Sequence, residues 1–274
     1  MCGIIGIASN KSVSINIINA LKKLEYRGYD SAGLATIANG EINEKKCPGR
    51  VEKLEKILFQ NPNEGILGIG HVRWATHGVP SQVNAHPHSS EIVSVVHNGI
   101  IENSDALKKN LEKSGKTFKS QTDTEVITVL LTEKLKKLEP LNAVFETLHM
   151  LKGSFALGII FKNFKDFVIG ARRGSPLAVG YSNNENYLGS DSYALKAMTN
   201  KISYLDDGDV CVLSKDQVKF YNSKKDKINK EVFTLSEDKS SASKGNYKNF
   251  MIKEIFEHPV TTKTCLKEYT DKIR

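Results

Sequence analysis

The sequence predicts an α+β protein in which mostly antiparallel sheets carry helices on their outer faces. Short apolar segments bounded by Gly, Asn and Asp recur near the start of the chain and again after residue 150, which is typical of antiparallel strands. Between them, residues 104–151 have the spacing of amphipathic helices. With 274 residues, 39% of them hydrophobic, the chain is long enough to bury a full core. Strands, a helical block and a strand-rich half in this order indicate α+β layering.

The first half of the chain alternates strands with helices. Its predicted strands cover residues 2–8, 31–38, 40–47, 65–75 and 91–99, and its predicted helices cover 13–26 and 49–60. The helix over 13–26 has apolar residues at helical spacing and stops at Arg27-Gly28. Asn39-Gly40 is a strong hairpin signal between the second and third strands. A long loop over 76–90 joins the last two strands, and a loop of this length inside a domain is usually functional.

The second half begins with helices and continues as short strands. Helices are predicted over 104–113, 123–138 and 141–151, and strands over 154–161, 166–172, 177–181, 187–191, 209–213 and 218–222. The segment TDTE predicts a capping box, with Thr122 at the N-cap and Glu125 at the third helical position. From Ser236 the composition becomes that of a linker, followed by one short helix that Pro259 ends and by a Lys-rich tail.

Composition excludes several classes of protein. The net charge is +8, but the lysines are spread over predicted helix faces among glutamates, so we expect no nucleic-acid partner. No apolar run approaches the about 20 residues that cross a bilayer, and no signal peptide precedes the first strand. We therefore expect a cytoplasmic protein with no membrane contact. The four cysteines are scattered without a CxxC pair, which indicates a reducing compartment.

A few polar residues next to predicted strands and helices suit one kind of chemistry. Cys2 would carry both a thiol and a free α-amine if Met1 were removed, as an N-terminal nucleophile requires. Asn98 and Gly99 end a strand and form either a plain turn or an oxyanion hole. Arg73 suits a carboxylate and Asp123 suits an ammonium group, although each alone also has a structural explanation. Together they complement glutamine.

Histidines are concentrated in the same region. Positions 71, 77, 86, 88 and 97 carry five of the seven histidines in the chain. Their spacing does not match a helical metal-binding pair, and no cysteine or close carboxylate completes a ligand set. We therefore expect no metal and no cofactor, and interpret most of these histidines as shaping a polar loop.

Ten motifs carry a resemblance to one family. They are MCGIIGI, LEYRGYDSAG, HVRWATHG, NAHPH, VVHNGIIEN, TDTEVI, LKGSFALGII, RRGSPLAVG, GSDSYAL and MIKEIFEHP. In this order, over residues 2–260, they closely resemble the glutaminase domain of the glucosamine-6-phosphate synthases, the glutamine–fructose-6-phosphate aminotransferase (isomerizing) family. The resemblance implies a class II glutamine amidotransferase with an Ntn-hydrolase fold, a four-layer αββα sandwich of two mainly antiparallel sheets.

The resemblance also implies roles for individual residues. It assigns Cys2 as the nucleophile and Asn98 and Gly99 as the oxyanion hole. Arg73 would bind the α-carboxylate of glutamine and Asp123 its α-ammonium, and Thr76, His77 and His86 would line the glutamine pocket. Trp74 would be the gate for ammonia, and Arg27 would support the nucleophile from behind.

The resemblance implies hydrolysis of L-glutamine to glutamate and ammonia over residues 2–240. Residues 241–274 would be the interdomain linker and the start of an absent sugar-phosphate isomerase region, so that fructose 6-phosphate would be aminated only in a longer, homo-oligomeric enzyme of amino-sugar biosynthesis. On this interpretation the chain is an excised or truncated piece of such an enzyme. Two alternatives remain open, namely the glutaminase domain of another class II amidotransferase and a silent glutamine-binding regulatory module.

Overall fold

Strands in the described part of the chain pair into two sheets, and every pairing between them is antiparallel. The computed structural model describes residues 2–76, 78–235 and 245–271. In spatial order, the first sheet contains β15 (Phe233–Thr234), β11 (Lys201–Tyr204), β9 (Ala178–Ser182), β10 (Glu185–Gly189), β1 (Gly3–Ser9), β4 (Leu67–Arg73), β2 (Ser31–Ala38) and β3 (Glu41–Pro48). The second contains β14 (Lys227–Ile228), β13 (Val218–Tyr221), β12 (Val210–Leu213), β8 (Phe164–Arg173), β7 (Gly153–Phe161), β6 (Val93–Ile101) and β5 (His88–Ser89).

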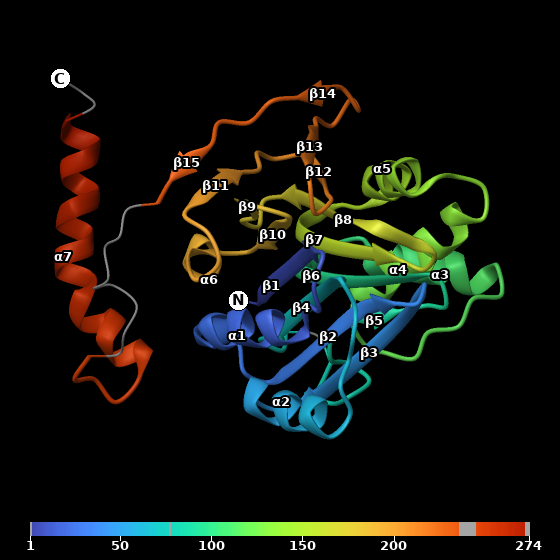
Figure 1. Ribbon diagram of the computed structural model, residues 1–274, viewed down its shortest axis with the longest axis horizontal. Coiled ribbons are helices and arrows are strands. Elements are labelled where there is room, and N and C mark those ends of the chain that lie inside the picture. Colours follow the sequence, from blue (N-terminus) through green and yellow to red (C-terminus); the bar gives the residue numbers. More distant parts are fainter. Residues whose placement is uncertain (1, 77, 236–244, 272–274) are drawn as a thin grey trace. The chain divides into compact units, whose positions relative to one another are not determined.

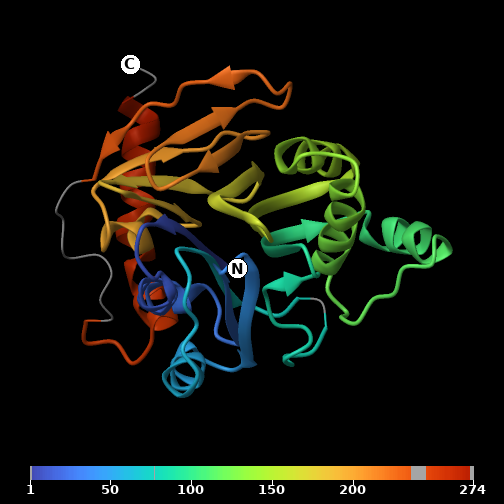
Figure 2. The ribbon, with the colours of Figure 1, turned by 45° about the vertical axis from the view of Figure 1, so that its right-hand side comes forward.

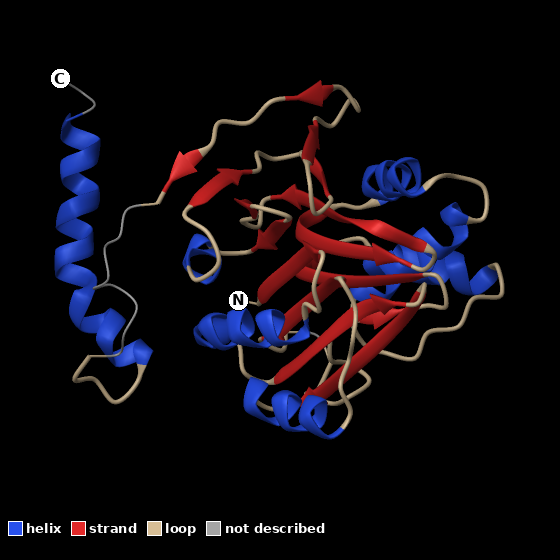
Figure 3. Ribbon diagram, viewed as in Figure 1, coloured by secondary structure: helices blue, strands red, loops and turns tan. Residues whose placement is uncertain are grey.

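Helices cover the outer face of each sheet (Figure 1). The first sheet packs against α1 (Ser14–Leu24), which the 3₁₀ turn η1 (Glu25–Arg27) extends, and against α2 (Val51–Gln60) and α6 (Ser192–Lys196). The second sheet packs against α4 (Thr124–Leu135) and α5 (Pro140–Met150), and α3 (Ser104–Lys113) lies beside α4. Figure 3 shows the strands gathered in the middle of this unit with the helices around them.

The four layers enclose three hydrophobic cores. Ile5 and Ile7 of β1 pack with α1 in the core under the first helical layer, while Ile4 and Ala8 pack between the two sheets. Successive residues of a strand point to opposite faces, so a strand buried on both sides is apolar throughout. A third core joins β6 and β7 to α4 and α5. The turned view in Figure 2 follows the same layers from another side. The predicted sandwich of two antiparallel sheets with outer helices is confirmed.

The hairpin predicted at Asn39-Gly40 is also confirmed. β2 and β3 pair with Ala38 opposite Glu41, and the two turn residues have φ angles of 53° and 83°. These left-handed conformations are those that a tight two-residue turn requires. The hairpin places β3 at the edge of the first sheet.

The chain divides into two units, Met1–Leu235 and Ser236–Arg274. The second unit contains α7 (Phe250–Asp271). The prediction that Pro259 ends a short helix is wrong, because Pro259 lies inside α7. The Thr261 hydroxyl donates to the carbonyl oxygens of Glu257 and His258 in the turn that contains Pro259. None of the helices in the described ranges is long and apolar enough to span a membrane.

Candidate active site

The thiol of Cys2 lies at the end of the first sheet, against the backbone of one residue. β1 and β4 are neighbours with Gly3 opposite Val72, which brings Cys2 beside the end of β4. The Trp74 N–H donates to Cys2 Sγ at 3.4 Å, and the thiol faces the Trp74 carbonyl oxygen at 3.6 Å. Burial raises the pKa of the Cys2 thiol, although the bond from the Trp74 backbone acts in the opposite direction. The resting group is therefore a thiol that needs a base before it can attack.

Arg27 binds the backbone of Cys2. Its Nε donates to the Cys2 carbonyl oxygen at 2.9 Å, and its Nη1 forms an ion pair with Asp191 at 3.3 Å. Tyr26 also donates to the Asp191 carboxylate, which in turn caps α6 by accepting from the Tyr193 N–H. The backbone of Cys2 is thus joined through one buried guanidinium to α6.

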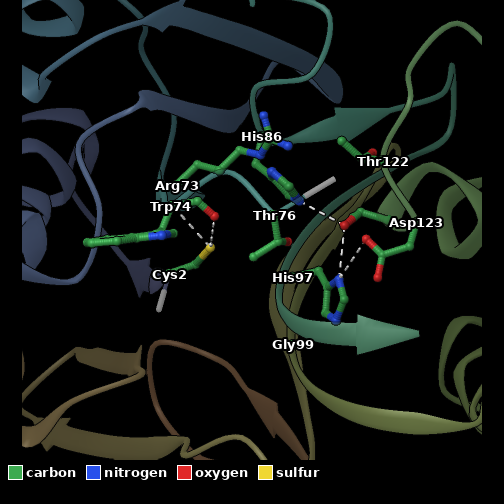
Figure 4. A pocket seen from close by; sticks show the side chains of 10 residues that line it. Cys2, Arg73, Trp74, Thr76, His86, His97, Gly99, Thr122 and Asp123 are labelled. Atoms are coloured by element: carbon green, nitrogen blue, oxygen red, sulfur yellow. Dashed lines mark hydrogen bonds and ion pairs between the residues drawn. The ribbon is translucent and has the colours of Figure 1, made fainter. Parts of the chain in front are cut away.

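A cavity beside the thiol collects side chains from both sheets (Figure 4). The described residues that line it are Cys2, Arg73, Trp74, Thr76, His86, His97, Gly99, Thr122, Asp123 and Thr124. Seven of the residues expected at the site are therefore brought together, namely Cys2, Arg73, Trp74, Thr76, His86, Gly99 and Asp123. Arg27 lies behind Cys2, Asn98 is adjacent to Gly99 but outside this lining, and His77 falls outside the described residues.

Arg73 and Trp74 form the wall of the cavity at the end of β4. Arg73 is 3% exposed, and its Nη2 donates to the Gly78 carbonyl oxygen at 3.1 Å. Burial lowers the pKa of the guanidinium, while the nearby Asp30 and Asp123 raise it. The Asp30 carboxylate also accepts from the Ala75 N–H at 2.8 Å and so fixes the start of the loop. The indole of Trp74 is 40% exposed and meets the ring of Tyr29 edge-on, with 5.9 Å between centroids.

Asp123 lies opposite, immediately before α4. Its Oδ2 accepts from the Ile101 N–H at 2.8 Å, and its Oδ1 is 3.9 Å from His97 Nδ1. The positive end of a helix dipole favours a carboxylate at this position. The predicted capping box is wrong. Asp123 rather than Thr122 is the N-cap residue, the Thr122 hydroxyl faces His88 Nε2, and Glu125 accepts from backbone N–H groups that precede the helix.

Gly99 occupies a position on β6 that only glycine fits. Its φ angle is 145°, and a Cβ atom there would lie 2.0 Å from the Ser154 carbonyl oxygen of β7. Successive strand residues alternate between faces, so His97 and Gly99 share a face, while Asn98 shares the face of Val96, which packs between the two sheets. The close approach of β6 and β7 leaves the Gly99 backbone at the cavity.

Four buried histidines lie at the cavity, two of them, His86 and His97, in its lining. The rings of His71 and His86 stack with 4.1 Å between centroids, and His88 meets His86 edge-on at 4.8 Å. His71 Nε2 donates to the His97 carbonyl oxygen at 2.9 Å. Burial lowers the pKa of all four, that of His71 to about 3. They are therefore neutral imidazoles at neutral pH, and within the described ranges no group of three potential ligands could hold a metal.

Three residues that line the cavity were not among the predicted site residues. They are His97, Thr122 and Thr124. The strand period offered a signal for His97, because it shares a face with Gly99. The two threonines offered none, since hydroxyl residues at the start of a helix are usually caps.

The central part of the chain matches a known protein family. Residues 71–197 match the glutamine amidotransferase domain. The chain is 46% identical over 98% of its length to the glutamine–fructose-6-phosphate aminotransferase (isomerizing) of Zymomonas mobilis, and 47% identical over 99% to that of Mesorhizobium japonicum. It covers 44% and 45% of these two proteins, so the chain spans about half the length of the curated relatives it matches.

Solved structures share the fold. The glutamine phosphoribosylpyrophosphate amidotransferase of B. subtilis, solved with ADP and GMP, superposes with a TM-score of 0.70 and 25% identity over 81% of this chain and 49% of that one. A glutamine aminotransferase class-II domain protein from Silicibacter pomeroyi superposes with a TM-score of 0.58 at 14% identity, over 81% of this chain and 99% of that one. The second likeness bears on the fold alone.

Proposed function

Because this chain belongs to the glutamine amidotransferases, we propose that it hydrolyses L-glutamine to glutamate and ammonia with Cys2 as the nucleophile. The observation that carries this proposal is the cavity that places the Cys2 thiol with Arg73 and Asp123. A buried guanidinium suits the α-carboxylate of glutamine, and a carboxylate at a helix N-terminus suits its α-ammonium. The side-chain amide then extends toward the sulfur.

The α-amine of Cys2 is the general base in this proposal. Removal of Met1, which lies outside the described residues, would leave an amine whose ordinary pKa is about 8, so neutral amine is present at physiological pH. A thiol whose pKa is raised by burial stays protonated until that amine takes its proton, directly or through a water. With Met1 in place the nitrogen is an amide and accepts no proton. The reaction therefore depends on the processed N-terminus.

The reaction proceeds through a covalent thioester. The sulfur attacks the side-chain carbonyl carbon of glutamine, and the carbonyl oxygen becomes an oxyanion that the Asn98 amide and the Gly99 N–H stabilise. The C–N bond breaks, and ammonia leaves with the proton that the α-amine had taken. Water then attacks the carbonyl carbon of the γ-glutamyl thioester with the α-amine as its base, and the C–S bond breaks. The hydroxyl of the water ends on glutamate, and the proton that the α-amine took from the water goes to the sulfur.

Lining residues complete the proposed pocket. Thr76 and His86 contact the bound glutamine in this proposal, and Trp74 lies where ammonia would leave. Arg27 holds the Cys2 backbone while the sulfur changes its bonding partner. The bond from Arg27 to the Cys2 carbonyl oxygen supports this last assignment.

We further propose that the ammonia serves a longer enzyme. The relatives at 46% and 47% identity are named for amination of fructose 6-phosphate and are about twice as long as this chain. On this proposal residues 241–274 lead into a sugar-phosphate isomerase region that binds fructose 6-phosphate and forms glucosamine 6-phosphate, in a cytoplasmic homo-oligomer. A glutaminase domain of the purine type is a weaker candidate, because its solved representative is only 25% identical.

The test combines the intact mass of the protein, covalent labelling by a glutamine analogue and the rate of glutamine hydrolysis. We expect the purified active protein to lack Met1 and to gain one equivalent of a diazo-ketone analogue of glutamine. Cys2→Ala should abolish both labelling and glutamine hydrolysis while glutamine still binds. Cys265→Ala is the matched control, because Cys265 is an exposed cysteine outside the cavity and should leave both intact. Normal turnover by the Cys2→Ala protein, or by protein that retains Met1, would overturn the proposal.

A further inference from the structure

One hydroxyl joins two imidazoles beneath the proposed glutamine pocket. Thr124 Oγ1 lies 2.8 Å from His86 Nε2 and 2.9 Å from His97 Nδ1. Thr124 is 1% exposed, and both histidines are buried as well, so water does not compete for these bonds. In Figure 4 these contacts are the dashed lines that run from His86 and from His97 to one shared oxygen, and a further dashed line joins His97 to Asp123.

A hydroxyl has a single proton, which couples the two rings. Thr124 can donate to one imidazole nitrogen only, and it must accept from the other. One ring therefore presents a lone pair to Thr124 and the other presents an N–H. The hydroxyl thus fixes the tautomer of each histidine relative to the other. Both hydrogen bonds to Thr124 form with two neutral rings.

The same His97 nitrogen faces the carboxylate proposed to hold the ammonium group. His97 Nδ1 is 3.9 Å from Asp123 Oδ1, close enough for strong attraction if His97 carried a proton on both nitrogens. Burial lowers the pKa of His97 although Asp123 acts in the opposite direction, so the ring is neutral at neutral pH. The bond to Thr124 holds Nδ1 in place and keeps it away from a direct hydrogen bond with Asp123.

We propose that Thr124 is a positioning residue for glutamine binding, whose hydroxyl locks His86 and His97 as neutral tautomers and leaves the Asp123 carboxylate for the ammonium group of the substrate. This rests on the proposed function. Without the hydroxyl, His97 is free to bond with Asp123, and the substrate must then displace it. Because Thr124 does not contact the sulfur, its loss affects binding rather than the bond-breaking steps.

A matched pair of variants tests the proposal. Thr124→Val keeps the size of the side chain and removes the hydroxyl, whereas Thr124→Ser keeps the hydroxyl. We expect KM for glutamine to rise about tenfold in Thr124→Val, the factor that the loss of one buried hydrogen bond represents, with kcat within about threefold of wild type. Thr124→Ser should have nearly the wild-type KM. A wild-type KM in Thr124→Val, or equal defects in the two variants, would overturn the proposal.

A second measurement needs no variant. In ¹⁵N-histidine-labelled wild-type protein, His86 Nε2 and His97 Nδ1 should have opposite protonation, one N–H and one lone pair, with both rings neutral at pH 7. The same protonation state on both nitrogens would refute the coupling even if Thr124→Val did not fold. If wild-type protein fails to hydrolyse glutamine while this signature is present, the proposed function fails and the hydroxyl link survives.

Discussion

Acid should destabilise this fold well above the pH at which carboxylates titrate, because its histidines are buried as neutral rings. His71 is fully buried, and its pKa falls to about 3 from an ordinary value of 6.5. Between these two values the unfolded chain binds a proton that the folded chain does not, so the free energy of unfolding decreases as pH falls. The stabilisation is complete above about pH 6.5 and is lost progressively below it.

The size of the effect follows from the same pKa values. At pH 5.5 an unfolded imidazole is protonated about ten to one, and each such histidine then lowers the free energy of unfolding by about 1.4 kcal/mol relative to pH 7.5. His86 and His88 are shifted well below 6.5 as well, so these two with His71 approach about 4 kcal/mol together, and His97 is shifted in the same direction. This is comparable with the whole stability of many domains.

Urea unfolding followed by circular dichroism at pH 7.5 and pH 5.5 measures this loss. In His71→Gln the difference between the two pH values should shrink by about 1.4 kcal/mol, although the variant is less stable at both. His149→Gln is the control, because His149 lies exposed on the surface. An unchanged pH difference in His71→Gln would refute the reasoning.

Four further substitutions test the site and its support. Gly99→Ala places a Cβ atom 2.0 Å from the carbonyl oxygen of β7 and should lower the free energy of unfolding by about 3 kcal/mol or more, measured in urea, whereas Gly115→Ala meets no atom within 4 Å and should cost only about 1 kcal/mol. Equal losses would contradict the steric argument. Arg73→Ala and Asp123→Ala should each weaken glutamine binding by about 2–5 kcal/mol in calorimetry on the inactive cysteine variant, and unchanged affinity would remove that residue from the pocket. Asn98→Ala should lower kcat by about 10²–10³-fold with little change in KM, and a wild-type kcat would exclude the amide from the oxyanion hole.

Sequence patterns predicted the layers because local signals and burial agree there. Strands buried on both faces read as apolar runs, and the Asn39-Gly40 turn has one favoured geometry. The failures are places where tertiary contacts override a local rule. Thr122 has the sequence of a helix cap, yet its hydroxyl lies against His88, and the helix begins later. Pro259 has the sequence of a helix end, but α7 continues through it.

In the candidate site, too, sequence motifs indicate some residues, whereas other contacts could not be predicted. The motif residues point to Cys2 and Arg73, and antiparallel pairing of β1 with β4 places them side by side. The partner of Arg27 is Asp191, which lies 164 residues away, and no local pattern connects the two. The link between His86 and His97 through Thr124 likewise depends on how a loop, a strand and a helix pack. Such bonds join residues that are distant in sequence, so they follow only from the tertiary structure.

The cavity is lined by Arg73 from the first sheet and by Gly99 from the second. A molecule that touches both would bind only when the halves of the sandwich are docked, so its binding energy would add directly to the free energy that holds them together. Glutamine or a covalent analogue would therefore stabilise the whole unit against unfolding, and the melting temperature of the protein would rise with the concentration of glutamine.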